Sequence, residues 1–258
     1  AFSGPMHMTG DPDGPPMPTG QSIGDVMSGV HAVAGIGYAL FHRERTGKGQ
    51  FVDIAMVDSL FHSQELAVQG PSLTGMRWKP KRSGHRSAIN SPLGAFKGPE
   101  GWVVIQCMEA QWPRFVEAIG QPELLTDERF ADLSGRTRNR DALNEIIEEW
   151  MQGFETDHEV LDILEHARVP SAPVLAPYEA IGHPYFESRG AIKKVYDPFL
   201  GDFHVPGDPL HFSEFPEPLD LVAPTLGQHN LSILKELGFT EKEIAELEEE
   251  KVIGQGDT

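Results

Sequence analysis

Cysteine is almost absent from this sequence: Cys107 is the single one among 258 residues. One cysteine excludes an intrachain disulfide and is typical of a reducing compartment, so we expect a cytoplasmic protein. Cys107 ends the apolar run 102–107, whose composition predicts a strand. In such a run we expect a buried, inert thiol and not a nucleophile.

Long apolar runs are also lacking. A helix needs about 20 predominantly apolar residues to cross a bilayer, whereas the most apolar stretch here, 23–41, is interrupted by Ser28, His31 and several glycines. Residues 1–5 show neither the charged start nor the apolar core of a signal peptide. The sequence therefore predicts no membrane span.

Positive charge is in short supply. The chain has 21 Lys and Arg against 39 Asp and Glu, which gives a formal net charge of −18. This balance argues against nucleic acid or an anionic membrane as a partner. The apolar content of 39% and the length of 258 residues suit a globular chain with one large or two smaller cores.

Several catalytic signatures are missing as well. The eleven histidines form no His-Glu-x-x-His pattern and no other standard ligand spacing. No Walker loop and no Gly-x-Ser-x-Gly elbow occurs. We therefore expect no metal and no redox cofactor.

What the sequence does contain is a distinctive stretch at 18–58. Apolar residues recur every three or four positions over 23–40 and spread onto the other faces, which predicts a buried helix. Four glycines inside it each cost about 1 kcal/mol relative to alanine, which suggests close approach of a backbone or a ligand. A basic end at 42–45 and a turn at 46–49 follow, and 50–56 is predicted to be a buried strand.

Asp25 lies where the polar turn becomes this helix. A first-turn carboxylate stabilises a helix through the positive end of the helix dipole. The same carboxylate could instead be a nucleophile that forms an acyl-enzyme intermediate. His31, on the opposite side of the helix, is expected to make packing or polar contacts and not to act as a base. Residue chemistry alone leaves the role of Asp25 open.

A series of short motifs, in a fixed order, covers nearly the whole chain. They are Ser3-Gly4, Gly14-Pro15-Pro16, Ile23-Gly24-Asp25, His42-Arg43-Glu44-Arg45-Thr46-Gly47-Lys48-Gly49-Gln50, Arg82-Ser83-Gly84-His85-Arg86, Pro92-Leu93-Gly94-Ala95-Phe96, Trp112-Pro113, Val169-Pro170-Ser171-Ala172-Pro173-Val174 and Leu226-Gly227-Gln228-His229. In their order and spacing they resemble the family III CoA-transferases, the CaiB/BaiF group that includes formyl-CoA transferases and the α-methylacyl-CoA racemases.

The resemblance implies an α/β fold in which part of a Rossmann-like large domain is joined to a smaller α+β domain. We expect the large-domain part at 1–69, a linker at 70–92, the small domain at 93–185, and a return segment with a C-terminal helix at 186–258. The family fold is an interlocked homodimer. The family pattern has a further N-terminal part that is absent before Ala1, so a fragment is expected here, with the loop 1–20 hanging free.

The resemblance also implies an activity: transfer of CoA from an acyl-CoA to a carboxylic acid, with Asp25 as the catalytic nucleophile. The CoA thioester is a substrate, and no cofactor is implied. Gly24 and Glu109 are expected to bind substrate. So are Gly84, His85 and Arg86, which stand where the transferases carry a mobile, glycine-rich loop. This sequence has only one glycine, Gly84, in that loop. Glu109 also lies at the start of a predicted helix, which its carboxylate would stabilise.

Two alternatives remain at this point. One is an α-methylacyl-CoA racemase or epimerase of the same family, in which Asp25 would take part in α-proton transfer. The racemases carry a glutamate near the position of Glu109. The other is a non-catalytic fragment or assembly subunit.

Local patterns predict the elements of the small domain. A hairpin turns at 98–101, helices cover 112–119 and 136–152, a capping box starts another helix at Thr156, and a short edge strand lies at 174–175. Trp102, Trp112 and Trp150 are expected to be core aromatics. Paired strands are predicted within 190–215, and Thr240 should cap the last helix.

Overall fold

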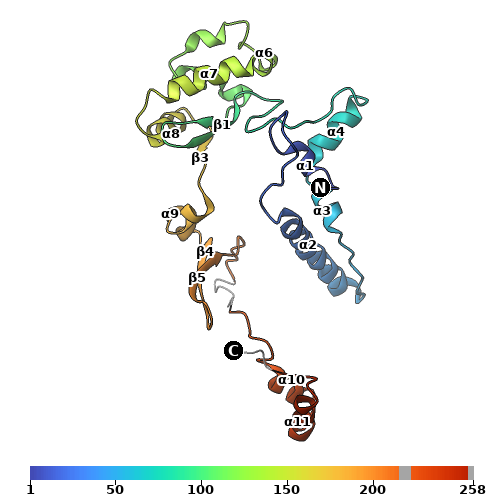
Figure 1. Cartoon of the computed structure of the whole chain (residues 1–258). Coiled ribbons are helices and arrows are strands. Elements are labelled where there is room, and N and C mark those ends of the chain that lie inside the picture. Colours follow the sequence, from blue (N-terminus) through green and yellow to red (C-terminus); the bar gives the residue numbers. More distant parts are fainter. Residues whose placement is uncertain (215–221, 255–258) are drawn as a thin grey trace. The chain divides into compact units, whose positions relative to one another are not determined.

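The computed structural model describes residues 1–214 and 222–254. It separates into two compact units, Ala1–Val174 and Leu175–Thr258, each described by itself below. Figure 1 shows the elements in chain order. The predicted domain boundaries stay a prediction, while the mixture of helices and small sheets agrees with the α/β expectation.

Helices are the only regular elements in the first 80 residues. They are α1 (Pro5–Met8), α2 (Ile23–Thr46), α3 (Met56–His62) and α4 (Glu65–Leu73). The predicted end of α2 is confirmed: Gly47 adopts φ 72°, and its N–H donates to the carbonyl of Arg43 at 2.7 Å. A left-handed glycine in this position is a common helix C-cap.

The predicted burial of α2 is wrong, because none of its residues is buried. Its apolar side chains are largely exposed, and Val33 retains 65% of its accessible surface. Two glycines do allow close approach: a Cβ on Gly24 would lie 3.3 Å from Leu60, and one on Gly35 would lie 3.2 Å from Val52. Around Gly29 and Gly37 there is open space. A single short helix, α3, covers only part of the apolar surface that the sequence pattern creates.

The predicted strand at 50–56 is also wrong. Residues 48–55 are irregular and mostly exposed, and α3 already begins at Met56. A strand needs a neighbouring strand edge for its N–H and C=O groups, and none of the described residues offers one to this segment. The Rossmann-like sheet is therefore not seen in residues 1–69.

By length and composition, α2 is long and apolar enough to cross a membrane, which corrects the expectation that no segment meets this criterion. Core helices of globular proteins and signal sequences pass the same test. Length and composition alone therefore do not place α2 in a membrane.

The loop 1–20 is tied down and does not hang free. Arg82 donates to the carbonyls of Asp11 and His7, both at 3.2 Å. The N–H of Gly84 donates to the carbonyl of Gly10 at 3.0 Å. The basic segment near residue 82 therefore binds backbone carbonyls of this loop.

The part of the first unit that follows residue 92, called the small domain below, contains an antiparallel sheet in the order β1-β2-β3. Its strands are β1 (Leu93–Lys97), β2 (Trp102–Gln106) and β3 (Ser171–Pro173). The predicted hairpin turn is confirmed, since the N–H of Gly98 donates to the carbonyl of Gly101 at 3.0 Å. The edge strand ends one residue before the predicted range 174–175.

Helices complete this domain around one apolar core. They are α5 (Trp112–Ala118), α6 (Leu133–Arg138), α7 (Arg140–Met151) and α8 (Asp157–His166), with the short 3₁₀ helices η1 (Glu109–Gln111) and η2 (Pro122–Leu125). In place of the single predicted helix 136–152 there are two helices, α6 and α7. The helix is interrupted at Asn139, whose side chain donates to the carbonyls of Arg129 and Gly135. The capping box at Thr156 is confirmed.

The three small-domain tryptophans differ in burial. Trp112 is buried, as predicted, and Trp150 is half-buried against the core. The prediction for Trp102 is wrong: it is 42% exposed, because alternation along β2 turns Val103 and Ile105 inward and Trp102 outward.

The second unit has a hairpin and short helices. These are η3 (Pro177–Ala180), α9 (Pro184–Ser188), β4 (Ile192–Asp197), β5 (Gly201–Pro206), α10 (Asn230–Glu236) and α11 (Glu241–Glu249). The predicted strand pair is confirmed as antiparallel β4 and β5. The capping box at Thr240 is confirmed as well. The last residue of the predicted range 190–215 lies outside the described residues.

Candidate active site

The carboxylate of Asp25 lies in the first turn of α2, as the sequence predicts. The helix begins after Ser22, whose side chain makes no capping hydrogen bond. Asp25 is exposed, and no described residue forms a hydrogen bond or an ion pair with it. Its two oxygens are therefore accessible beside the helix end whose dipole favours negative charge.

The residues that support Asp25 pack α2 against α3. Gly24 gives Leu60 room to approach the first turn of α2. About two turns further on, the ring of His31 contacts the ring of His62 edge-on, with 5.3 Å between centroids. His31 Nδ1 also bonds the carbonyl of Met27 at 2.7 Å. The prediction that His31 makes packing and polar contacts is thus confirmed.

The segment 84–87 is held against the first strand of the small sheet. The N–H of Ala95 donates to the carbonyl of His85 at 2.8 Å, and Arg86 forms an isolated bridge with Gly94. A Cβ on Gly94 would lie 2.5 Å from the carbonyl oxygen of His85, so only glycine fits there without displacement. The outward face of His85 contacts the ring of Trp102.

Arg86 makes the tightest contact of this segment. Its Nη2 pairs with Glu148 Oε1 of α7 at 2.5 Å, and its guanidinium lies 5.3 Å from the centroid of the Phe96 ring. Its Nε is buried and has no hydrogen-bond partner among the described residues. The charge of Arg86 is therefore largely neutralised by Glu148. The role of the segment in substrate binding stays a prediction.

Glu109, in η1, forms an ion pair with Arg136 of α6. The Arg136 side chain is buried, with 1% of its surface exposed, whereas that of Glu109 is 61% exposed. Arg136 also donates to the carbonyls of Ser91 at 3.2 Å and Phe130 at 3.0 Å. Its guanidinium lies 4.5 Å from the centroid of the Trp112 ring. Four partners of three kinds thus surround one buried cation: a carboxylate, two backbone carbonyls and an aromatic ring.

Sequence reasoning missed Arg136. Its neighbours Ser134, Thr137 and Arg138 are polar, so the local pattern is that of an exposed helix start. Two of the partners that make it a core residue, Ser91 and Glu109, lie 45 and 27 residues away in the sequence, so no local signal reveals them.

Cys107 is buried, as predicted. Burial raises the pKa of its thiol from 9.0 to about 12, and the nearby Glu109 carboxylate adds to the rise while Arg136 and Arg114 oppose it. A thiol with such a pKa is protonated at neutral pH, so Cys107 is not a nucleophile.

The structure brings the predicted site residues together only in part. Arg86 and Glu109 both bind partners inside the small domain, and Gly84 binds the N-terminal loop. No hydrogen bond, ion pair or ring contact joins any of them to Asp25 in the described residues. Nor do those residues contain a cluster of three or more His, Cys, Asp or Glu that could hold a metal ion.

Comparison with known proteins gives consistent matches. The family model described as CoA-transferase family III matches residues 1–230. A succinyl-CoA:mesaconate CoA-transferase of Haloarcula marismortui is 34% identical over 92% of this chain. A formyl-CoA:oxalate CoA-transferase of Streptomyces avermitilis is 33% identical over 98% of it. Among solved structures, a CaiB/BaiF family protein from Brucella suis matches with a TM-score of 0.73 and 30% identity over 92% of the chain.

The chain spans only part of these relatives: 59% of the Haloarcula protein, 65% of the Streptomyces protein and 61% of the Brucella structure. The family model nevertheless covers both Asp25 and the whole small domain. On these matches, the chain belongs to CoA-transferase family III.

Proposed function

We propose that this chain carries the nucleophile of a CoA-transferase that moves CoA from an acyl-CoA to a carboxylic acid. The observation that carries the proposal is the position of Asp25: an exposed, unpaired carboxylate at the start of α2, inside the segment that matches the family. A nucleophilic carboxylate needs oxygens that the thioester can reach, and the exposed oxygens of Asp25 meet this condition.

The reaction follows from carboxylate chemistry. The Asp25 carboxylate attacks the thioester carbonyl, the C–S bond breaks, and a mixed anhydride and CoA thiolate form. The thiolate then attacks the aspartyl carbonyl, which releases the donor carboxylate and leaves an aspartyl-CoA thioester. The acceptor carboxylate reverses both steps, so that a new acyl-CoA leaves and free Asp25 returns. Each step passes through an oxyanion that backbone N–H groups can stabilise, and those near Gly24 and Gly84 are our candidates.

Hydroxylamine trapping tests this function in the complete encoded protein, including any sequence on either side of these 258 residues. During turnover with an acyl-CoA, hydroxylamine should convert Asp25 to a hydroxamate that peptide mass spectrometry locates. Asp25→Asn should abolish both transfer and trapping. Asp58→Asn is the matched control, because Asp58 is likewise an exposed first-turn carboxylate, in α3, and it should leave both unchanged. Undiminished transfer by Asp25→Asn would refute the proposal.

The racemase alternative predicts a different result. In that case the protein should exchange the α-hydrogen of an acyl-CoA with deuterated water, and hydroxylamine should trap nothing on Asp25. Glu109 is engaged by Arg136, and no hydrogen bond or ion pair in the described residues joins it to Asp25, which favours the transferase. A non-catalytic role would be indicated if the complete protein turned over no acyl-CoA at all.

We further propose a homodimer, in which a partner surface covers α2. Contiguous exposed apolar side chains on one helix are typical of an interaction surface, and Val26, Val30 and Val33 of α2 each retain at least 60% of their surface. The absence of metal and redox cofactors and the cytoplasmic location stay predictions.

A further inference from the structure

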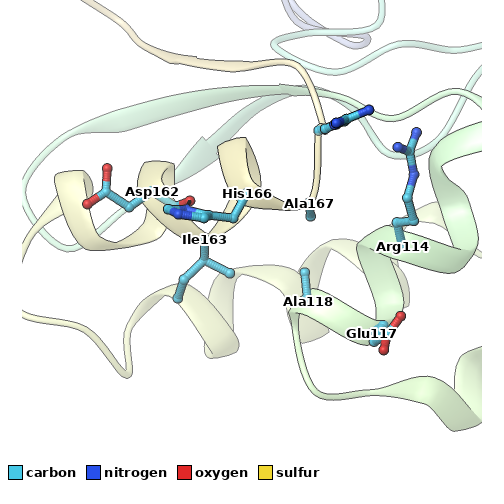
Figure 2. Close-up of a pocket in the computed structure, with 8 residues that line it drawn as sticks. Arg114, Glu117, Ala118, Asp162, Ile163, His166 and Ala167 are labelled. Atoms are coloured by element: carbon cyan, nitrogen blue, oxygen red, sulfur yellow. Dashed lines mark hydrogen bonds between the residues drawn. The ribbon is translucent and has the colours of Figure 1, made fainter.

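A pocket of about 690 Å³ lies on the small domain between α5 and α8 (Figure 2). Its volume falls within the range of small-molecule sites. It is lined by Arg114, Glu117, Ala118, Asp162, Ile163, His166, Ala167 and Arg168. None of these residues belongs to the candidate active site.

The two arginines of this pocket are exceptional in the chain. Most arginines bind a carboxylate, a carbonyl, a hydroxyl or an aromatic ring; these are Arg43, Arg45, Arg77, Arg82, Arg86, Arg129, Arg136, Arg138 and Arg140. Among the described residues, only Arg114, Arg168 and Arg189 have no such side-chain partner. Two of these three line the same pocket. In a chain with a net charge of −18, two unpaired guanidinium groups in one concavity indicate a site for an anion.

The backbone at Arg168 adds a second observation. It follows α8 with φ 54°, in the left-handed region, and its N–H donates to the carbonyl of Glu165 at 2.8 Å. The N–H of Val169 donates to the carbonyl of Leu164 at 2.9 Å, which completes a Schellman cap. Glycine is the favoured residue at this position. Here the position instead places an exposed, unpaired arginine at the pocket, and strain of this kind is often found at ligand sites.

The remaining lining suits the rest of an organic ligand. Ala118, Ile163 and Ala167 provide small apolar contacts on which a flat ring can lie. Glu117 and Asp162 are carboxylates that can accept hydrogen bonds from hydroxyl or amino groups. Figure 2 shows the side chains of Arg114 and Glu117 leaving α5 in different directions, and no ion pair joins them.

We propose that this pocket binds a nucleoside phosphate, with the phosphate on Arg114 and Arg168 and the ring on the apolar side chains between α5 and α8. Guanidinium groups are well suited to phosphate oxygens, and the carboxylates would take the sugar hydroxyl or ring amino groups. A free nucleotide and the nucleotide end of a CoA thioester share this chemistry. Binding of the nucleotide end of CoA rests on the proposed function, whereas binding of a free nucleotide does not.

Calorimetric titration of the full chain with ADP and, separately, with CoA tests the proposal. Arg114→Gln and Arg168→Gly should each weaken binding about tenfold or more, since each removes a charged hydrogen-bond donor. Arg168→Gly also relieves the left-handed strain, so its thermal stability should not fall below that of the wild type. Arg189→Gln is the matched control: it removes an unpaired arginine of the other unit and should leave the dissociation constant unchanged.

The results separate the two sources. Binding of ADP alone identifies a free nucleotide, and binding of both ligands with the same dependence on Arg114 and Arg168 identifies the nucleotide end of CoA. Saturable binding of neither ligand would overturn the proposal, as would equal losses in Arg189→Gln or none in the two pocket variants. Asp25→Asn should leave ADP binding unchanged, so this test and that of the transferase can fail independently.

Discussion

The buried cation Arg136 allows a quantitative prediction about stability. Replacing it with methionine retains most of the side-chain volume but removes every polar contact. The carbonyls of Ser91 and Phe130 then lose their donor inside the core, at about 1–3 kcal/mol each. The contact with the Trp112 ring is lost as well, and a desolvated contact of this kind contributes about 2 kcal/mol.

An opposing term reduces the total. Burying a guanidinium costs several kcal/mol in desolvation, and Arg136→Met removes that cost. The ion pair with Glu109 adds little to the balance, because Glu109 is 61% exposed and water solvates its charge when Arg136 is gone. We therefore expect a net loss of about 2–4 kcal/mol, below the roughly 3–5 kcal/mol typical when removal of one partner leaves the other charge buried.

Urea unfolding followed by circular dichroism measures this loss as a shift of the midpoint at constant slope. Glu109→Gln keeps an oxygen that can accept a hydrogen bond from Arg136 but removes the countercharge of this buried cation, so it should also destabilise the fold, by about 1–3 kcal/mol. Arg138→Met is the matched control on the same helix, since Arg138 is exposed and bonds only Ser134; a surface change of this kind costs about 0.5 kcal/mol or less. A loss below 1 kcal/mol in Arg136→Met, or an equal loss in Arg138→Met, would refute the reasoning.

Three further predictions concern the small domain. In Gly98→Ala the new Cβ would lie 2.1 Å from Asp157 Oδ1, so we expect a loss of about 1–3 kcal/mol; an unchanged melting temperature would contradict this. Gly94→Ala should push away the backbone at His85, which faster amide hydrogen exchange over 84–87 would reveal. Since burial raises the pKa of Cys107 from 9.0 to about 12, its contribution to stability is complete below pH 9 and is lost as pH rises toward 12. In Cys107→Ala the free energy of unfolding should depend less on pH between 9 and 12 than in the wild type. The same pH dependence in both proteins would exclude this explanation.

The predictions that held depend on residues close together in the sequence. Thr156 accepts from the N–H of Glu159, and Thr240 does the same for Glu243. Caps of this kind use partners three residues apart, so local sequence specifies them. The position of Asp25 in a first helical turn is of the same kind.

The predictions that failed depend on what lies opposite an element. The sequence pattern of α2 indicates a helix that is buried on most sides, yet the described residues cover it only in part. Residues 50–56 have the composition of a strand, yet no described strand pairs with them. Arg136 shows the converse, because an ordinary-looking polar position becomes core through partners far away in sequence. The pocket between α5 and α8 was likewise invisible, since it depends on which arginines remain unpaired after folding.

The exposure of Asp25 constrains the proposed chemistry further. A carboxylate in bulk water gains little from preorganised donors, because the high dielectric constant weakens every interaction with the developing oxyanion. Covalent transfer through Asp25 therefore requires another surface to exclude water from the start of α2. The exposed valines of α2 lie on the helix that carries Asp25, so a partner that buries them would also approach the carboxylate. Dimerisation and catalysis should consequently be lost together when this apolar surface is made polar, and retained together when it is not.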